Sequence, residues 1–282
     1  MRLAHITDLH LERTPQLSEL VNKRLLGAVN LYLMGRSKHF SAASQRGVVE
    51  ALLRLAPDRV VCTGDLTATA TDAEFDAFIE FIKPVVDRMP FDCIPGNHDV
   101  YTAESVGRYR ARFDPDFSPV RTIDIGPVTL CLVDVCSPDW LSRGRAEPST
   151  LSLLDAALGA AAKSVILCLH YPLRDRRGAV YGPPKRALMN ASEIEALIDK
   201  HPCVKAVLHG HEHHGFNTTV GVRSVPIFNP GAGGYAFLPK KGRTAHFNVY
   251  EVDETGIVGV ERYAWNGTTF EPEKGGAYAT GG

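Results

Sequence analysis

The chain has 282 residues, 44% of them hydrophobic and 22% charged, and its 31 basic and 32 acidic side chains give a formal net charge of −1. This balance argues against a broad nucleic-acid-binding face and a polybasic membrane anchor, while the composition is that of a globular protein with a sizeable core. No run approaches the ~20 apolar residues of a membrane-spanning helix, and the amino terminus has no apolar stretch long enough for a signal peptide.

Short apolar runs rich in β-branched residues alternate along the chain with segments of helical periodicity. Strands are expected at 3–7, 59–63, 91–94, 128–133, 165–169 and 204–208, and helices at 41–56, 73–88, 148–162 and 191–200. From about residue 216 the strand signals have no strong helix between them, which predicts antiparallel strands that complete a sheet. The pattern predicts a single α/β domain over 1–270, followed by a flexible Gly- and Ala-rich tail at 271–282.

One early segment departs from this alternation. Between residues 15 and 40, apolar side chains recur every three or four positions beside several lysines and arginines. This pattern predicts a basic amphipathic helical insertion. Two interpretations stay open for it: a helix packed on its own domain, or a lid or membrane-surface element beside the active site.

The cysteines favour a reducing compartment. None of the six forms a C-x-x-C pair, and most of them lie within apolar runs. The six are Cys62, Cys93, Cys131, Cys136, Cys168 and Cys203. We interpret them as small buried hydrophobic residues of a cytoplasmic protein.

Side chains that can bind metals follow five of the expected strands. The groups are Asp8-Leu9-His10, Gly64-Asp65, Gly96-Asn97-His98-Asp99, His170 and His209-Gly210-His211-Glu212-His213. The gap of two in each D-x-H or H-x-H pair places both side chains on one face of an extended chain. Because open α/β sheets place their sites at the carboxyl ends of strands, we expect the five groups to meet at one rim.

The donor atoms of this set indicate the metals. Oxygen and nitrogen ligands without thiolates suit Mn, Fe or Zn rather than a structural zinc site. The candidates are too many for one tetrahedral ion and fit two ions that share a carboxylate: Asp8, His10, Asp65, Asn97, His170, His211 and His213.

In order and without a missing member, these blocks resemble the signature of calcineurin-like metallophosphoesterases, in particular the class III bacterial cyclic-nucleotide phosphodiesterases. The resemblance implies a four-layer αββα sandwich of two mixed β-sheets and a dinuclear metal centre. It further implies that one metal is held by Asp8, His10, Asp65 and His213, the other by Asp65, Asn97, His170 and His211, and that His98 is a catalytic histidine beside them.

Two divalent ions roughly 3.5–4 Å apart can acidify a bridging water to hydroxide and clamp a phosphoryl oxygen, so that solvent is the nucleophile. A protonated His98 could bind a phosphoryl oxygen or protonate the leaving alkoxide. For Asp99 two roles stay open: fixing the orientation of His98, or capping a turn.

The expected activity is hydrolysis of a small phosphodiester, such as a cyclic nucleotide or a glycerophosphodiester. One alternative is a lipid-linked pyrophosphate hydrolase, which the basic segment at 15–40 motivates. Another is a non-catalytic protein-binding scaffold, as in a retromer subunit of the family, although such members have lost ligands and every block is filled here. No stable nucleic-acid complex is expected, whereas a weak membrane-surface contact and a homodimer stay open.

Several other residues match no ligand position. His5, His201 and His214 are interpreted as structural or exposed, and His209 as a support for the metal shell. Asn229-Pro230-Gly231 forms a Gly-rich turn, for which a plain loop is preferred over a substrate contact. Tyr181-Gly182-Pro183-Pro184 is a candidate pocket wall without an assigned role.

Overall fold

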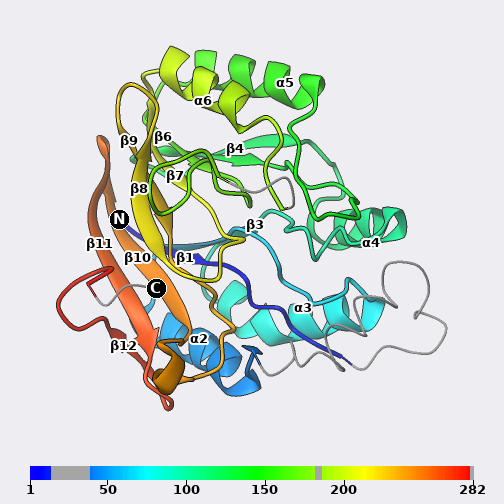
Figure 1. Ribbon diagram of the computed structural model, residues 1–282, viewed down its shortest axis with the longest axis vertical. Helices are drawn as coiled ribbons and strands as arrows, with labels where there is room; N and C mark the ends of the chain where they lie inside the picture. Colours follow the sequence, from blue (N-terminus) through cyan, green and yellow to red (C-terminus); the bar gives the residue numbers. More distant parts are fainter. Residues whose placement is uncertain (14–38, 182–185, 280–282) are drawn as a thin grey trace.

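The computed structural model describes residues 1–13, 39–181 and 186–279. Two six-stranded sheets pack face to face, with α2 and α3 outside one sheet and α5 and α6 outside the other (Figure 1). The insertion expected at 15–40 lies outside the described residues except for His39 and Phe40, so its helical character stays a prediction.

The first sheet has the order β12-β11-β10-β1-β2-β3. Strand β2 runs parallel to β1 and β3, and the pairs β1–β10, β10–β11 and β11–β12 are antiparallel. The strands are β1 (Arg2–Ile6), β2 (Arg59–Cys62), β3 (Phe91–Cys93), β10 (His246–Asp253), β11 (Gly256–Trp265) and β12 (Phe270–Pro272).

The second sheet has the order β4-β5-β6-β7-β9-β8, with β5, β6, β7 and β9 mutually parallel and antiparallel strands at both edges. Its strands are β4 (Val120–Asp124), β5 (Thr129–Val133), β6 (Val165–Cys168), β7 (Val204–Leu208), β8 (Phe216–Val220) and β9 (Val225–Asn229). The strands after residue 216 therefore complete both sheets rather than one, since β8 and β9 join the second sheet and β10 to β12 the first.

The helices begin where side chains satisfy free backbone amides. Ser41 Oγ accepts a hydrogen bond from the Ala43 amide at the start of α2, and Thr71 and Glu74 form a capping box on α3. The helices are α2 (Ala42–Leu55), α3 (Asp72–Val86), α4 (Ala103–Phe113), α5 (Pro148–Gly159), α6 (Ala191–Lys200) and the 3₁₀ turn η4 (Pro239–Lys241). Among the helices of the described ranges, none has the length and apolar character to span a bilayer.

Three hydrophobic layers hold the sandwich together. On β1, Ala4 and Ile6 belong to the layer beneath α2 and α3, whereas Leu3 belongs to the layer between the sheets. This alternation is that of a strand covered on both faces. A third layer packs α5 and α6 on the second sheet through residues such as Leu154 and Ile194. The predicted four-layer αββα sandwich of two mixed sheets is confirmed.

Residues beyond position 270, where the sequence predicted a flexible tail, still pack against the domain. Glu273 is buried, and its carboxylate lies 3.0 Å from Nη1 of the fully buried Arg262 on β11. The Glu273 carboxylate also accepts a hydrogen bond from the Tyr278 amide at 2.7 Å. The boundary expected at residue 270 is therefore too early, because the buried guanidinium requires a counter-charge from beyond it. Residues 280–282 lie outside the described residues.

Candidate metal centre

The loops that follow β1, β2, β3, β6 and β7 carry the predicted metal-binding side chains. Within each sheet these strands are parallel, so their carboxyl ends lie at the same edge. Contacts between side chains join all the predicted ligands into one cluster: Asp8, His10, Asp65, Asn97, His170, His211 and His213.

The backbone at four of the seven predicted ligands is left-handed rather than extended. The φ angles are 52° at Asp8, 49° at His10, 54° at Asp65 and 69° at His211. The expectation that the D-x-H and H-x-H pairs share a face of extended chain is therefore wrong. Left-handed backbone is strained for residues with a Cβ and tends to occur at functional sites. Here backbone hydrogen bonds of 2.9 Å from the Asp8 amide to Gly64 O and from the His10 amide to Asp65 O stabilise it.

Asp8, His10, Asp65 and His213 form the first ligand set, with one potential ligand atom from each lying within 4.8 Å of all the others. His10 Nε2 lies 3.2 Å from His213 Nε2 and 3.4 Å from Asp65 Oδ2. Asp8 Oδ1 is buried and has no hydrogen-bond partner among the described residues, although it lies 3.7 Å and 3.6 Å from the two imidazole nitrogens. A buried carboxylate oxygen without a donor is costly, and a cation among these atoms would satisfy it, so the residues fit a metal ion.

The second predicted ligand set shares Asp65 with the first. Asp65 Oδ1 lies 3.5 Å from His170 Nε2. Asn97 Oδ1 lies 3.3 Å from His170 Nε2 and 2.8 Å from His211 Nδ1. The carboxylate of Asp65 therefore directs one oxygen toward each of the two predicted sets.

Backbone carbonyls orient two of the imidazoles. Thr63 O lies 2.7 Å from His170 Nδ1, and Arg186 O lies 3.1 Å from His211 Nε2. Since a carbonyl only accepts hydrogen bonds, these contacts assign the N–H to those nitrogens. The lone pairs of His170 Nε2 and His211 Nδ1 are then directed at Asn97, and a carbonyl behind an imidazole is a common partner for a metal ligand.

The electrostatics of the cluster favour the metal-binding protonation states. Burial lowers the pKa of His170, and burial together with the charge of His170 lowers the pKa of His211 well below its usual range. Burial alone would raise the pKa of Asp8, but the neighbouring His10 and the positive charge that His213 and His170 carry when protonated outweigh this and lower it. The cluster therefore offers a carboxylate at Asp8 and neutral imidazoles at His170 and His211, the forms that ligate metals.

Two glycines of the motifs allow the loops to approach closely. A Cβ on Gly96 would lie 2.2 Å from Asp65 Oδ1 and 2.3 Å from the Asp65 amide nitrogen. On Gly210 it would lie 1.9 Å from Thr7 Oγ1. The loops after β3 and β7 could not reach their neighbours with any larger residue at these positions.

His98 lies beside the cluster and is 8% exposed. Its ring contacts that of His10 at a centroid distance of 4.8 Å, and its Nδ1 lies 2.6 Å from Ala68 O. Its backbone amide donates a hydrogen bond to Asp65 Oδ1 at 2.8 Å. The Ala68 carbonyl therefore assigns the N–H to Nδ1 and orients the ring.

Asp99 has a different role from the orientation of His98. Its carboxylate accepts hydrogen bonds from the amides of Leu66, Thr67 and Gly96 at 3.1, 2.9 and 2.9 Å, and from Thr67 Oγ1 at 2.9 Å. Burial raises its pKa to about 6, against the lowering effect of these hydrogen bonds. The carboxylate holds together the loops after β2 and β3, so the loop-capping interpretation of Asp99 replaces the catalytic one.

Sequence reasoning missed the residues that surround His10 and His213. The Phe40 ring lies 4.3 Å from that of His10 and 5.4 Å from that of His213, and the Tyr235 ring lies 5.2 Å from that of His213. Gln45 on α2 donates a hydrogen bond to His10 O at 3.3 Å. No motif marks these residues, because each is brought to the site by packing between distant segments.

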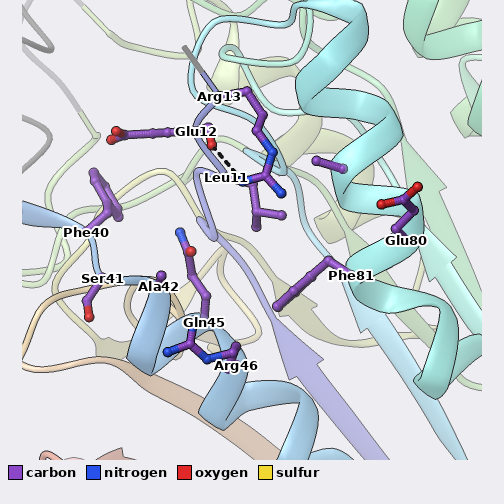
Figure 2. Close-up of a pocket in the computed structure, with 11 residues that line it drawn as sticks. Leu11, Glu12, Arg13, Phe40, Ser41, Ala42, Gln45, Arg46, Glu80 and Phe81 are labelled. Carbon is purple, nitrogen blue, oxygen red and sulfur yellow. Dashed lines mark hydrogen bonds between the residues drawn. The ribbon is translucent and has the colours of Figure 1, made fainter.

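Phe40 and Gln45 also line a pocket of about 440 Å³ between α2, α3 and the chain that follows β1 (Figure 2). Figure 2 shows the aromatic ring of Phe81 and the charged side chains of Arg13 and Glu80 around the same hollow. The described lining includes none of the predicted metal ligands, so this pocket is adjacent to the site rather than part of it.

The remaining predicted residues take structural positions. His5 is buried, with Nδ1 3.0 Å from Tyr250 Oη and Nε2 2.9 Å from Thr63 Oγ1. Tyr181 donates a hydrogen bond of 2.6 Å to Glu212, and both line a second pocket of about 650 Å³. The position of Tyr181 agrees with the interpretation of Tyr181-Gly182-Pro183-Pro184 as a pocket wall, and the rest of that segment lies outside the described residues.

The fold and the ligand cluster together define the metallophosphoesterase class of α/β sandwich. The sequence profile described as "Calcineurin-like phosphoesterase" matches residues 1–215. The chain belongs to the calcineurin-like phosphoesterase family.

Curated relatives carry the names of phosphodiesterases. The chain is 30% identical to the 3',5'-cyclic adenosine monophosphate phosphodiesterase CpdA of Escherichia coli over 158 residues, which cover 55% of this chain and 54% of that protein. The match therefore spans about half the length of this relative. The chain is also 26% identical to the glycerophosphodiester phosphodiesterase GpdQ of Enterobacter lignolyticus over 220 residues, which cover 76% of this chain and 71% of that protein.

Solved structures agree on the fold. A dimetal phosphatase from Danio rerio superposes with a TM-score of 0.66 at 14% identity, and the alignment covers 96% of this chain and 98% of that one. At this level of identity the similarity concerns the architecture alone.

Proposed function

We propose that the chain is a dinuclear-metal-dependent phosphodiesterase that hydrolyses a small diester. The observation that carries the proposal is the position of Asp65, whose two carboxylate oxygens lie 3.4 Å from His10 Nε2 and 3.5 Å from His170 Nε2. A carboxylate shared in this way suits two cations a few ångströms apart, the arrangement used for in-line displacement at phosphorus.

Each ligand set has its own residues. Asp8, His10 and His213 would hold one ion and Asn97, His170 and His211 the other, with Asp65 common to both. When bound, such ions supply Lewis-acid charge at the phosphoryl group and acidify water. The oxygen and nitrogen donors suit Mn, Fe or Zn.

His98 is the proposed acid. The Ala68 carbonyl holds its Nδ1–H, so proton exchange with a substrate falls to Nε2. In the protonated state that nitrogen donates a hydrogen bond to a phosphoryl oxygen, or its proton to the departing alkoxide. Because the backbone amide of His98 donates a hydrogen bond to Asp65, the proposed acid and the shared carboxylate are held in a fixed position relative to each other.

The substrate class is proposed from the relatives. Their names specify cyclic AMP for one and glycerophosphodiesters for another, and both are small diesters. A net charge of −1 agrees with a small anionic substrate bound at a local cationic centre rather than with a polyanion. The lipid-pyrophosphate alternative rests on residues 15–40 and stays a prediction, and the scaffold alternative is disfavoured because every ligand position is filled.

A substrate panel tests the proposal. Protein stripped with a chelator and reloaded with Mn²⁺ is assayed on a chromogenic monoester and its matching diester, cyclic AMP, a glycerophosphodiester and a nucleotide-linked lipid pyrophosphate. We expect diester hydrolysis that chelation abolishes and Mn²⁺ restores. Hydrolysis of the monoester or the lipid pyrophosphate in preference to every diester would contradict the substrate class. Activity that survives complete metal removal would contradict the mechanism.

A further inference from the structure

Asn229 connects a Gly-rich turn to the loop that bears two of the proposed metal ligands. It is the last residue of β9 and is fully buried. Its Nδ2 donates hydrogen bonds to Gly210 O at 3.3 Å and to Glu212 O at 2.9 Å. Its Oδ1 accepts a hydrogen bond from the Gly231 amide at 2.8 Å. The side-chain amide is thus bonded on both sides.

The two carbonyls that Asn229 binds belong to the residues immediately before His211 and His213. A peptide plane is rigid, so fixing the carbonyl of one residue also fixes the amide of the next. Other contacts complete the hold on this loop. The Gly210 amide donates to His170 O at 3.0 Å, and the His211 amide donates to Asp8 Oδ2 at 3.0 Å.

The turn that begins at Asn229 supports the same loop from its other end. The Ala232 amide donates a hydrogen bond to His213 O at 3.1 Å. Gly231 has a φ angle of 90°, and a Cβ there would lie 3.0 Å from the Gly215 amide nitrogen. The turn therefore lies directly against the ligand loop, and the Asn229 Oδ1 contact with Gly231 maintains its shape.

The left-handed conformation of His211 explains why the loop needs such support. At a φ angle of 69° a residue with a side chain is strained, and surrounding contacts must stabilise the conformation. Only a group with two N–H hydrogens can donate to both carbonyls while an oxygen faces the turn, and the asparagine amide provides this combination. A carboxylate of the same shape would place an acceptor against two acceptors.

We propose that Asn229 is a positioning residue that sets His211 and His213, one ligand in each proposed metal set. This inference rests on the ligand assignment of the proposed function. It goes beyond that function by giving the Asn229-Pro230-Gly231 turn a role in metal affinity without contact with metal or substrate. Partners behind the ligands of a metal site typically contribute 10–100-fold to affinity.

The test is calorimetric titration of chelator-treated protein with Mn²⁺. Asn229→Asp keeps the acceptor for the Gly231 amide and loses both donated hydrogen bonds, so it separates the turn from the ligand loop. We expect ~10–100-fold weaker Mn²⁺ binding and a fall in kcat that excess Mn²⁺ partly reverses. Thermal unfolding in the presence of chelator shows whether the Asn229→Asp variant is folded. If that variant is unfolded, Asn229→Ser is used in its place.

Asn190→Asp is the matched control. Asn190 is also buried, and both polar atoms of its side-chain amide bond to the backbone of Ala146. Its Nδ2 donates to Ala146 O at 2.9 Å, and its Oδ1 accepts from the Ala146 amide at 3.0 Å. The Asn190→Asp variant should keep wild-type Mn²⁺ affinity even if its stability falls. Wild-type affinity in the Asn229 variants, or an equal loss in Asn190→Asp, would overturn the inference alone. Failure of the wild-type protein to bind two Mn²⁺ would overturn the proposed function and the inference with it.

Discussion

The side chain of Asp65 and the backbone of His98 are joined by a hydrogen bond of 2.8 Å, although the two residues lie 33 positions apart in the sequence. The proposed shared carboxylate and the proposed acid are therefore parts of one unit, built from the loops after β2 and β3. The carboxylate of Asp99 holds the same two loops together through the amides of Leu66 and Gly96.

Removal of the shared carboxylate should abolish catalysis. Asp65→Ala deletes an oxygen from each ligand set, so we expect fewer than two ions per chain and a loss of turnover on the order of 10³-fold or more. Elemental analysis and steady-state rates measure both effects. Asp87→Ala, which breaks an exposed ion pair with Lys83, serves as the control and should keep full activity. A near-normal rate with full metal content in Asp65→Ala would refute the assignment.

Replacement of His98 should separate catalysis from metal binding. His98→Ala leaves both ligand sets intact, so the metal content should equal that of the wild type. Turnover of substrates with poor leaving groups should fall by ~10²–10⁴-fold, because the departing alkoxide loses its acid. Diesters with an activated phenol as leaving group need less protonation and should lose less. An equal loss across all leaving groups would contradict the role as an acid.

The close approach at Gly96 gives a prediction about stability. Gly96→Ala should lower the free energy of unfolding by ~1–3 kcal/mol and weaken metal binding, because the added Cβ overlaps the amide nitrogen of Asp65. Gly107→Ala makes the same change in the exposed interior of α4, where no atom of the described residues outside the adjacent helix backbone lies within 4 Å of the new Cβ. It should stabilise by ~0.5–1 kcal/mol through helix propensity. Denaturant titration of both variants should give opposite signs, and equal signs would count against the packing argument.

Buried His5 should make stability depend on pH. Burial, followed by the charge of His209, lowers its pKa from 6.5 to about 3. Between these values the unfolded chain binds a proton that the folded chain does not, so the free energy of unfolding falls as pH falls below 6.5. The limiting slope for one group is ~1.4 kcal/mol per pH unit. In chelator-treated protein, His5→Gln should show a shallower fall between pH 6.5 and 5 than the wild type, whereas parallel curves would show that His5 does not contribute.

The packed carboxy-terminal segment predicts a large effect at Glu273. Glu273→Ala leaves the guanidinium of Arg262 buried without its carboxylate, which should cost ~3–5 kcal/mol of unfolding free energy. Glu271→Ala removes an exposed carboxylate two positions earlier and should change stability by no more than ~0.5 kcal/mol. Thermal and denaturant unfolding distinguish the two, and similar stabilities would mean that the segment after β12 contributes little.

Much of the architecture could be predicted from local pattern. The strands at 59–63 and 204–208 and the helix at 191–200 follow runs whose period and end signals agree, and the structure places β2 (Arg59–Cys62), β7 (Val204–Leu208) and α6 (Ala191–Lys200) there. The ligand types and their order were also readable, because metal chemistry restricts which side chains can serve. Helix α4 and strand β4 were missed, since both are rich in charged and polar side chains and neither contains a continuous apolar run.

The geometry behind the ligands could not be predicted in this way. The D-x-H spacing reads as extended chain, but Asp8 and His10 take left-handed backbone because the loop after β2 bonds their amides. Asn229 lies 16 positions after His213 and meets the ligand loop only because β9 pairs with β7. Such contacts depend on tertiary packing, for which a single sequence carries no local signal.

Diffraction from crystals grown with Mn²⁺, recorded at the manganese absorption edge, tests the central claim most directly. The account predicts two anomalous peaks roughly 3.5–4 Å apart, with Asp65 bound to both, His10 to one and His170 to the other. A single peak, or peaks remote from Asp65, would contradict it.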